Sequence, residues 1–275
     1  MPLSPVAVVG ATYTASERGL AADVLCARAL GLAPLPVCTA IVVASGGRVT
    51  DVTDVPVDTV RAQLDHVTES GPVAGAKIGI LGNAKTAIAV LDAAAALDGP
   101  VVLDWTASGP SGETVLDARG VDAVASALSV PDLVTLSKAD AELVTDAQIE
   151  SLDDAQVAAQ RIHNRGARAV LIRCGTLPYR FYDAADDPGS DGRERLFADL
   201  FYDGEDFALF EAPAVDASPD GAASAFSLAA LAALVGGEGM ERALQRAKAF
   251  ATESVRHAVA VEGHAERLRT NWQTD

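Results

Sequence analysis

Residues 219–224, with the sequence PDGAAS, combine small side chains with one carboxylate, directly before an Ala- and Leu-rich run over 222–235. The composition and periodicity of that run predict a helix. The first amides of a helix lack partners within the helix, and the helix dipole favours negative charge near them. We therefore expect the amides of Gly221, Ala222 and Ala223 to bind an anion such as a phosphate. An Asp–Gly pair before a helix is also a common turn and cap, and this alternative stays open.

Other polar residues follow or flank predicted strands, which is where ligands bind in doubly wound sheets. These residues are the stretch from Thr12 to Arg18, followed by Lys77, Asn83, Asp104, Ser137, Asp140, Glu142 and Arg173. Lys77 has two interpretations, a contact to phosphate or a structural ion pair before a buried strand. The four histidines are far apart in the sequence and indicate no histidine metal site.

The charge balance restricts the class of partner. The chain has 38 acidic and 21 basic residues in 275, which gives a formal net charge of −17. The electrostatic field of this negative charge repels nucleic acids and anionic membrane surfaces, so we expect neither as a partner. An acidic surface also serves solubility, and a polyanionic nucleotide would need local donors to overcome it.

Targeting signals and cysteine usage predict a cytoplasmic protein. The N-terminus has no basic stretch followed by an apolar run, and the longest apolar run, 225–235, is too short to cross a bilayer. The three cysteines, Cys26, Cys38 and Cys174, are too widely spaced for a zinc pattern or a disulfide framework. They are typical of buried thiols in a reducing compartment.

Short β-branched runs alternate with Ala-rich segments of helical period, which predicts an α/β fold with a doubly wound, mostly parallel sheet flanked by helices on both faces. The predicted parallel strands are 6–9, 36–43, 76–81, 100–104, 133–135 and 169–173, and the predicted helices are 17–30, 56–69, 84–97, 153–165, 222–235 and 240–261. The sequence also predicts an extended piece over 49–55, an exposed loop over 183–194, and antiparallel strands at 196–202 and 207–211. We expect a single domain over 1–261 and a frayed polar tail over 262–275.

The order of these segments resembles the hydroxymethylpyrimidine/phosphomethylpyrimidine kinases, which are ribokinase-superfamily enzymes related to pyridoxal kinases. The sequence AKIGILGN at 76–83 is close to that family's Lys-Ile-Gly-Met-Leu-Gly-Ser block and is the most specific match. RGLAAD at 18–23 is similar to the family's Gly-rich first turn and helix start. PVVLD at 100–104 is similar to its Val-Val-Leu-Asp-Pro strand, and YDGE at 202–205 is similar to the turn before its anion hole.

This resemblance implies a ribokinase-like fold, ATP and Mg²⁺ as cofactors, a small-molecule substrate phosphorylated on a hydroxymethyl group, and a homodimer. It assigns nucleotide contacts to Gly221, Ala222, Ala223, Asp104, Ser137 and Arg173, substrate contacts to Thr12, Arg18, Gly19, Asp23, Ala44 and Lys77, and metal contacts to Asp104 and Asp140.

Several residues depart from the family pattern. The family's Gly-Thr-Gly-Cys is GAAS at 221–224, so Ser224 stands where this family has Cys and the wider superfamily has a catalytic Asp. A serine hydroxyl is a poor base unless another group activates it, and Asp220 is the nearest carboxylate in the sequence. Ser224 and Asp220 are therefore the catalytic candidates.

The magnesium and pyrimidine motifs are also altered. The family's Thr-Pro-Asn-Leu-Pro-Glu-Ala is TLSKADA at 135–141, and its Gln-Asn pair is Ala44-Ser45. Two functions stay open: an active small-molecule kinase, or a catalytically impaired pseudokinase that binds nucleotide or metabolite in a regulatory or scaffolding role.

Overall fold

The computed structural model describes residues 3–45, 47–175, 181–183 and 193–271. Its sheet has the strand order β10-β9-β7-β6-β5-β4-β1-β2-β3, and β8 pairs with β9 beside this path. The strands are β1 (Ser4–Tyr13), β2 (Leu32–Ser45), β3 (Arg48–Asp54), β4 (Ala76–Ile78), β5 (Val101–Trp105), β6 (Leu133–Ser137), β7 (Val170–Gly175), β8 (Phe181–Asp183), β9 (Arg193–Tyr202) and β10 (Phe207–Pro213). Neighbouring strands from β7 to β2 are parallel, and β9, β10 and β3 add antiparallel edges.

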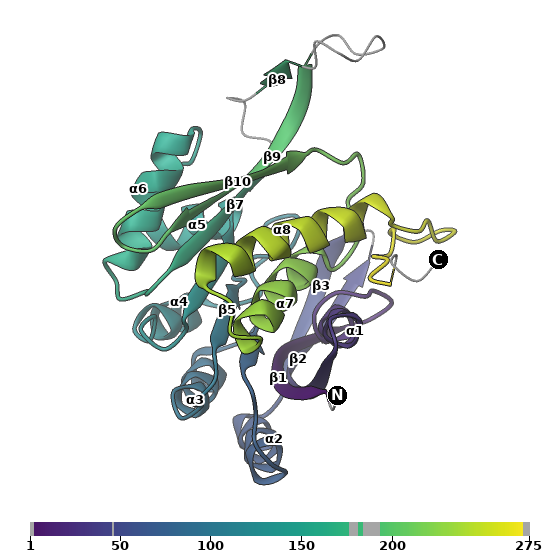
Figure 1. The fold of residues 1–275 in the computed structure, drawn as a ribbon. Helices are drawn as coiled ribbons and strands as arrows, with labels where there is room; N and C mark the ends of the chain where they lie inside the picture. The colour runs from purple at the N-terminus through teal and green to yellow at the C-terminus, as the bar shows by residue number, and fades with distance from the viewer. Residues whose placement is uncertain (1–2, 46, 176–180, 184–192, 272–275) are drawn as a thin grey trace.

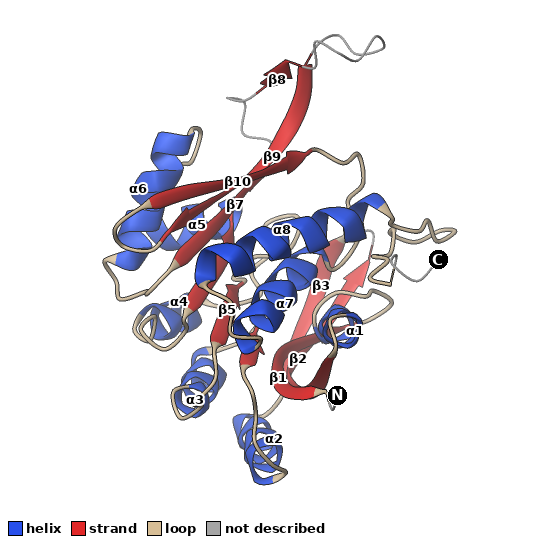
Figure 2. Cartoon of the chain, in the orientation of Figure 1, coloured by secondary structure: helices blue, strands red, loops and turns tan. Residues whose placement is uncertain are grey.

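Helices cover both faces of the sheet (Figures 1 and 2). One layer contains α2 (Val57–Glu69), α3 (Ala84–Ala94), α4 (Ala118–Ala125), α5 (Lys138–Thr145) and α6 (Leu152–His163), and the other contains α1 (Leu20–Ala29), α7 (Ala222–Val235) and α8 (Met240–Arg256). The central strands are buried on both sides, as parallel strands between two helix layers must be. In β1, for example, Ala7 and Val9 pack in one apolar core while Val6 and Val8 pack in the other. This architecture confirms the predicted fold class.

The differences from the predicted elements are local. The ladder of β4 ends at Ile78 rather than at residue 81, and α8 ends at Arg256 rather than at residue 261. The short helices α4 and α5 were not predicted. Of the predicted loop 183–194, residues 184–192 lie outside the described residues.

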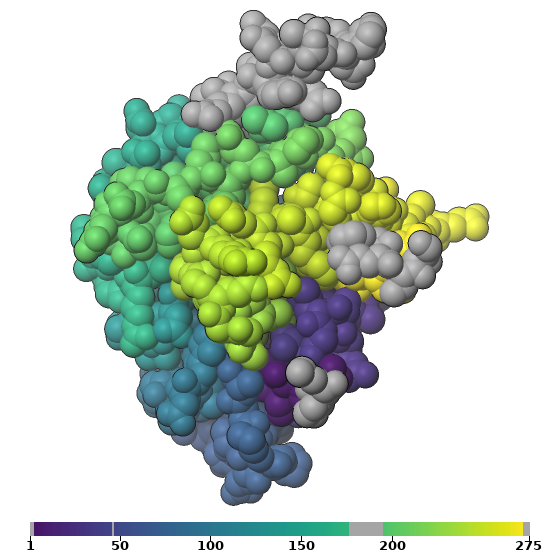
Figure 3. All heavy atoms as spheres, in the orientation of Figure 1, coloured from purple at the N-terminus to yellow at the C-terminus, as the bar shows by residue number. Residues whose placement is uncertain are grey.

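The segment after α8 packs against the rest of the protein at residues 266–270, whereas residues 259–265 are exposed. Its residues 266–270 are partly buried, and Arg267 forms backbone bridges with Val259 and Asp220. In Figure 3 this yellow C-terminal segment lies beside the purple N-terminal part of the chain. The amide of Asp220 donates to the carbonyl of Glu266 at 3.2 Å. The segment therefore anchors the loop that precedes α7.

Candidate active site

A cavity of about 340 Å³, here named the Lys77 cavity, lies where β1, β4 and β5 end and α7 begins. This is the edge at which a doubly wound sheet binds ligands. The polar and small residues that line it include Gly10, Tyr13, Arg18, Gly19, Asp23, Lys77, Asp104, Thr106, Ser218, Gly221, Ala222, Ala223 and Ser224. The structure thus brings residues from both ends of the chain around one space.

The start of α7 opens into the Lys77 cavity. Gly221 is the N-cap residue with φ 94°, and no side chain caps the helix. An added Cβ at Gly221 would lie 2.8 Å from the Cβ of Ala22, so a glycine is required by both the backbone and the space. Gly221, Ala222 and Ala223 line the cavity, while Asp220 and Ser224 are 4% and 5% exposed. The first amides of α7 are therefore available to an anion.

A buried chain of alternating charges forms one wall of the cavity. The Nζ of Lys77 donates to both carboxylate oxygens of Asp23, at 2.9 and 3.1 Å, and lies 3.9 Å from Asp104 Oδ2. Asp104 Oδ1 accepts from Arg173 at 2.9 Å and from the hydroxyl of Thr135 at 3.0 Å. The structural interpretation of Lys77, which we weighed against a phosphate contact, is thus realised as a two-carboxylate ion pair.

Each of these charges perturbs the others. Burial alone would raise the pKa of Asp104, but Arg173 and Lys77 together with hydrogen bonds hold that pKa below its ordinary value. Burial would lower the pKa of Lys77, but Asp23 and Asp104 raise it above its ordinary value. Lys77 is thus a fully charged ammonium whose charge is already matched by two carboxylates.

Asp23 differs from Asp104 because burial dominates its titration. Desolvation raises the pKa of the Asp23 carboxyl, although Lys77 and a hydrogen bond with the Ser224 side chain act in the opposite direction. Ser224 and Asp23 come from α7 and α1, two adjacent helices. Both residues line the Lys77 cavity, which places a carboxylate on the same side as the Ser224 hydroxyl, and the sequence did not reveal this.

Asp220 is held by three other side chains. Its Oδ1 accepts from Arg18 Nε at 2.6 Å, and its Oδ2 accepts from the Ser16 hydroxyl at 2.6 Å and from Arg267 Nη1 at 3.2 Å. With both oxygens engaged, Asp220 is placed as an anchor for the two arginines. The geometry does not support the role of catalytic base that we weighed for it.

Asp140 and Ser137 have structural partners of their own. Ser137 caps α5 through the amide of Asp140, and its hydroxyl donates to Asp140 Oδ2 at 2.7 Å. Asp140 Oδ1 accepts from the amide and hydroxyl of Ser108 and from the amide of Ala107. This carboxylate therefore fixes the loop after β5, and both of its oxygens already accept hydrogen bonds from protein groups.

The remaining predicted residues divide between the cavity and its surroundings. Arg18, Gly19, Asp23, Lys77, Asp104 and residues 221–224 are brought together. Thr12 lies within β1, and Ala44 lines a second cavity. Arg173 does not line the Lys77 cavity but donates a hydrogen bond to Asp104, which does. The stretch 12–18 named from the sequence contributes Tyr13 to both cavities and Ser16 to the second one. Sequence reasoning missed Ser218 and Arg267, for which neither spacing nor periodicity gave a signal.

The second cavity, of about 610 Å³, is named the His264 cavity. Three stretches enclose it: residues 13–18 after β1, the end of β2 at Ala44 and Ser45, and residues 263–265 of the C-terminal segment. It shares Tyr13, Arg18, Pro110 and Ser218 with the Lys77 cavity, so these four residues separate the two spaces.

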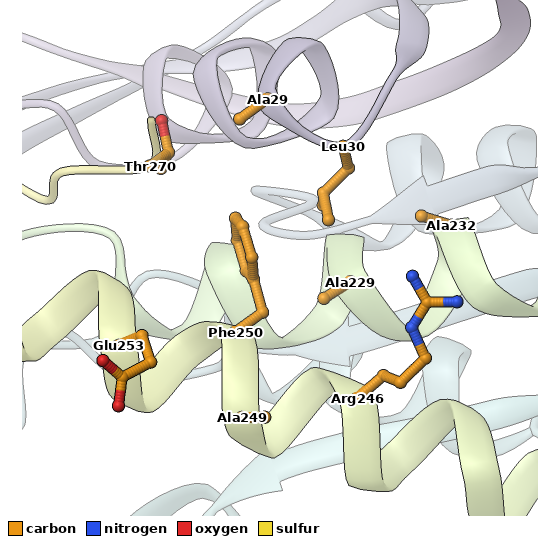
Figure 4. Close-up of a pocket in the computed structure, with 9 residues that line it drawn as sticks. All are labelled: Ala29, Leu30, Ala229, Ala232, Arg246, Ala249, Phe250, Glu253 and Thr270. Carbon is orange, nitrogen blue, oxygen red and sulfur yellow. The ribbon is translucent and has the colours of Figure 1, made fainter. Parts of the chain in front are cut away.

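A third cavity, of about 400 Å³, lies between α1, α7 and α8 (Figure 4). It is lined mainly by alanines and by Leu30 and Phe250, and it shares no lining residue with the other two cavities. Arg246 at its edge is paired with Glu238. It holds none of the predicted site residues.

A doubly wound sheet with an uncapped, glycine-led helix start at its ligand-binding edge defines a small-molecule kinase scaffold of the ribokinase type. The phosphomethylpyrimidine kinase family model matches residues 15–268, and the chain belongs to this family. It is 30% identical over 243 residues to the hydroxymethylpyrimidine/phosphomethylpyrimidine kinase of Aquifex aeolicus, covering 87% of this chain and 89% of that protein. The kinase of Haemophilus influenzae is 27% identical, with 94% of each chain covered.

Solved structures show the same fold. The pyridoxal kinase of Staphylococcus aureus in complex with pyridoxal has a TM-score of 0.82 at 22% identity, covering 99% of this chain and 95% of that one. An ADP complex of Bacillus subtilis pyridoxal kinase has a TM-score of 0.84 at 21% identity, covering 99% of this chain and 100% of that chain. These findings confirm the resemblance drawn from the sequence.

No helix in the described part of the chain is long and apolar enough to cross a membrane.

Proposed function

We propose that the protein transfers the terminal phosphoryl group of ATP to a hydroxymethyl group on a small heterocycle, of the pyrimidine or pyridoxal type, bound in the Lys77 cavity. The observation that carries this proposal is the opening of the α7 amides into the same cavity as Asp23 and Ser224. Family membership supports the reaction class, and the structures with ADP or an ATP analogue support the nucleotide.

In this reaction the amides at Gly221, Ala222 and Ala223 stabilise the charge that develops on the transferred phosphoryl group. The acceptor hydroxyl gives its proton to Ser224 Oγ while Ser224 gives its own proton to Asp23. The acceptor oxygen forms the new bond to phosphorus, and the bond between phosphorus and the ADP oxygen breaks. Lys77 holds the Asp23 carboxylate in place.

Ser224 acts here as a relay rather than as the base. A hydroxyl alone is too weak a base, but phosphoryl transfer depends mainly on positioning and charge stabilisation. The raised pKa of Asp23, caused by its burial, suits a proton acceptor. In this proposal, the pair of Ser224 and Asp23 takes the place of the Cys or Asp that the resemblance assigns to relatives.

The magnesium assignment receives little support from the side chains. Among the described residues, no group of three or more His, Cys, Asp or Glu side chains is arranged to hold a metal. Asp140 is occupied by backbone and hydroxyl donors, and Asp104 faces Arg173 and Lys77. These residues do not form a protein magnesium site, so an ion would be held chiefly by the phosphates of the nucleotide.

The second candidate function is a catalytically impaired relative that binds nucleotide or metabolite and regulates or scaffolds a partner. The observation in its favour is the engagement of both Asp220 oxygens, which leaves the relay through Ser224 as the proton route.

We also propose that the protein is a cytoplasmic homodimer. Free thiols at Cys26, Cys38 and Cys174 agree with a reducing compartment. Ile41 and Val43, two residues apart on β2, expose 46% and 39% of their surface on one face of the strand, which agrees with a contact between copies. Sedimentation velocity that gives the mass of a monomer at micromolar concentration would contradict the dimer.

The kinase proposal is tested with ATP, magnesium and a panel of hydroxymethylpyrimidine, pyridoxal and pyridoxine. We expect ADP release with at least one acceptor, a loss of about tenfold or more in kcat for Ser224→Ala, and retained activity for Ser224→Cys, which restores the family's residue. Thermal shift with the nucleotide is measured in parallel. Binding without turnover would favour the second function, and no stabilisation by any nucleotide would remove the kinase proposal.

A further inference from the structure

Arg267, in the C-terminal segment, joins two stretches of chain that both line the Lys77 and His264 cavities. Its Nη1 donates to Asp220 Oδ2 at 3.2 Å, directly before the start of α7. Its Nη2 donates to the carbonyl of Ala15 at 3.1 Å, and its Nε lies 3.9 Å from Glu17 Oε1, both in the loop between β1 and α1. Each nitrogen of one planar guanidinium thus faces a different partner, which the single ammonium of a lysine cannot reproduce.

The backbone of the loop between β1 and α1 depends on such support. Ala15 has φ 55°, a left-handed conformation that is unfavourable for a residue with a Cβ and persists only where surrounding contacts hold it. The Ser16 hydroxyl and the Arg18 side chain also bond to the Asp220 carboxylate. Two arginines here face two carboxylates, Asp220 and Glu17, so the cluster is balanced in charge and serves to fix the chain.

Arg267 is itself held in place through its backbone and its neighbour. Its amide and its carbonyl both pair with Val259 at 2.9 Å. Leu268 packs against the N-cap residue of α7, since a Cβ added at Gly221 would lie 3.1 Å from Leu268 Cδ1. The side chain of Arg267 is 17% exposed, and Arg267 is not among the described residues that line either cavity. It therefore acts on a ligand through the residues that it holds.

We infer that Arg267 is a positioning residue for the proposed phosphoryl transfer. By joining Ala15 and Glu17 to Asp220, it keeps the loop between β1 and α1 in register with the first amides of α7. A small misplacement of two reacting groups lowers the rate strongly even when both still bind. The inference rests on the proposed function, because that function places the acceptor beside this loop and the phosphoryl group at the start of α7.

Kinetics with ATP, magnesium and the best acceptor separate positioning from binding. Arg267→Gln is expected to lower kcat about tenfold and to leave the Kd of AMP-PCP within about twofold, because the packing of α7 itself holds its first amides. Arg267→Lys keeps the charge and one contact, and we expect it to recover part of kcat. Arg256→Gln is the control with unchanged kcat: Arg256 is exposed, pairs with Glu253 and is not among the described residues that line either cavity.

Hydrogen exchange without ligand tests the hold on the loop and does not depend on turnover. Residues 14–19 include the amides of Thr14 and Arg18, which are hydrogen-bonded in the structure. We expect these amides to exchange about tenfold faster in Arg267→Gln, while the amides of α3 exchange at an unchanged rate, which separates local loosening from a loss of global stability.

Unchanged exchange over residues 14–19, or faster exchange with an unaltered kcat, overturns the inference. Faster exchange in α3 as well also overturns it, because Arg267 would then support the fold as a whole. An absence of turnover in the unaltered protein contradicts the proposed function instead, and the exchange comparison then decides alone whether Arg267 holds the loop.

Discussion

Asp104 shows how single residues of the site depend on one another. It is 4% exposed, and it accepts hydrogen bonds from Arg173 and Thr135 while Lys77 lies 3.9 Å away. Taking a carboxylate out of water is costly unless its partners are close and well oriented. Asp104 therefore serves first to neutralise the cations at the ligand-binding edge of the sheet, and any role toward a nucleotide depends on this pairing.

The pH dependence of stability tests this view of Asp104. Its pKa is lower in the folded protein than in the unfolded chain, where it is near 3.8, so its contribution is present above pH 3.8 and is lost as the pH falls through the folded value. We expect Asp104→Asn to lower the free energy of unfolding by about 3 kcal/mol at pH 7, since it leaves buried cations unpaired. The difference between variant and unaltered protein is expected to shrink below pH 4.

Urea unfolding between pH 3 and pH 8 measures both effects. Asp65→Asn on the exposed side of α2 is the control and is expected to stay within about 0.5 kcal/mol of the unaltered protein. A constant difference across the pH range would show that Asp104 contributes through shape rather than charge.

Sequence reasoning found the residue types of the site better than their partners. Asp23, Lys77 and Asp104 were named from strand ends and family blocks, but the ion pair of Lys77 with Asp23 joins residues 54 positions apart. Arg18 and Asp220 are 202 positions apart, and Arg267 comes from a segment expected to be frayed. Such pairs form because the fold brings distant segments together, and no local pattern encodes them.

At the scale of elements, the start of α7 is the feature on which the proposed phosphate binding depends. Gly221 lets the chain turn into the helix with φ 94°, and its lack of a side chain allows α1 to pack at Ala22. The following helix is apolar and buried along most of its length, which holds its first turn rigidly against the sheet. The arrangement of the first amides of α7 is thus a consequence of how α7 packs, and not of a flexible loop.

Gly221→Ala is expected to disturb both the backbone and this packing. A left-handed conformation costs a residue with a Cβ about 1–2 kcal/mol, and the contact at 2.8 Å with Ala22 adds to this cost. We expect a drop in Tm and a loss of nucleotide binding of about tenfold or more, measured by thermal unfolding and by titration with an ATP analogue.

Gly237→Ala is the matched control. Gly237 has φ 82°, but an added Cβ there meets no atom within 4 Å, so only the backbone cost applies. It is expected to lower Tm while leaving nucleotide affinity unchanged. If Gly221→Ala binds nucleotide as tightly as Gly237→Ala does, the start of α7 is not the phosphate site.

The elements themselves were predicted where their periodicity was strong. The helices α2, α3, α6 and α7 agree closely with the predicted ranges because burial on one face or more imposes a regular pattern. The strands lie where they were predicted, but β1 and β2 extend beyond the predicted 6–9 and 36–43, and β4 is shorter than the predicted 76–81. The helices α4 and α5 have eight residues each, too few turns for a periodic signal. The chain leaves the ladder after Ile78 because the following residues lead to the Asn83 cap of α3, which a continuous apolar run does not reveal.

At the scale of the whole molecule, the acidic surface repels a phosphate that the proposed site at the start of α7 would attract. The formal net charge is −17, whereas the site offers uncharged amides and a lysine whose charge is matched by Asp23 and Asp104. A nucleotide that approaches the protein therefore meets long-range repulsion before it meets short-range donors. Salt weakens the long-range repulsion more than the short-range attraction, because it screens exposed charges more than it screens contacts with buried amides.

This imbalance predicts an unusual salt dependence of nucleotide affinity. Raising the ionic strength from 10 to 150 mM shortens the screening length from about 30 Å to about 8 Å. We expect the Kd of the ATP analogue AMP-PCP to fall by about two- to fivefold over this range, since repulsion by the distant carboxylates is screened while the amide contacts persist. Titration calorimetry measures the change, and adenosine, which is uncharged, is the control whose Kd stays constant. A Kd for AMP-PCP that rises with salt would show that an unmatched cation, rather than the amides of α7, provides the main attraction.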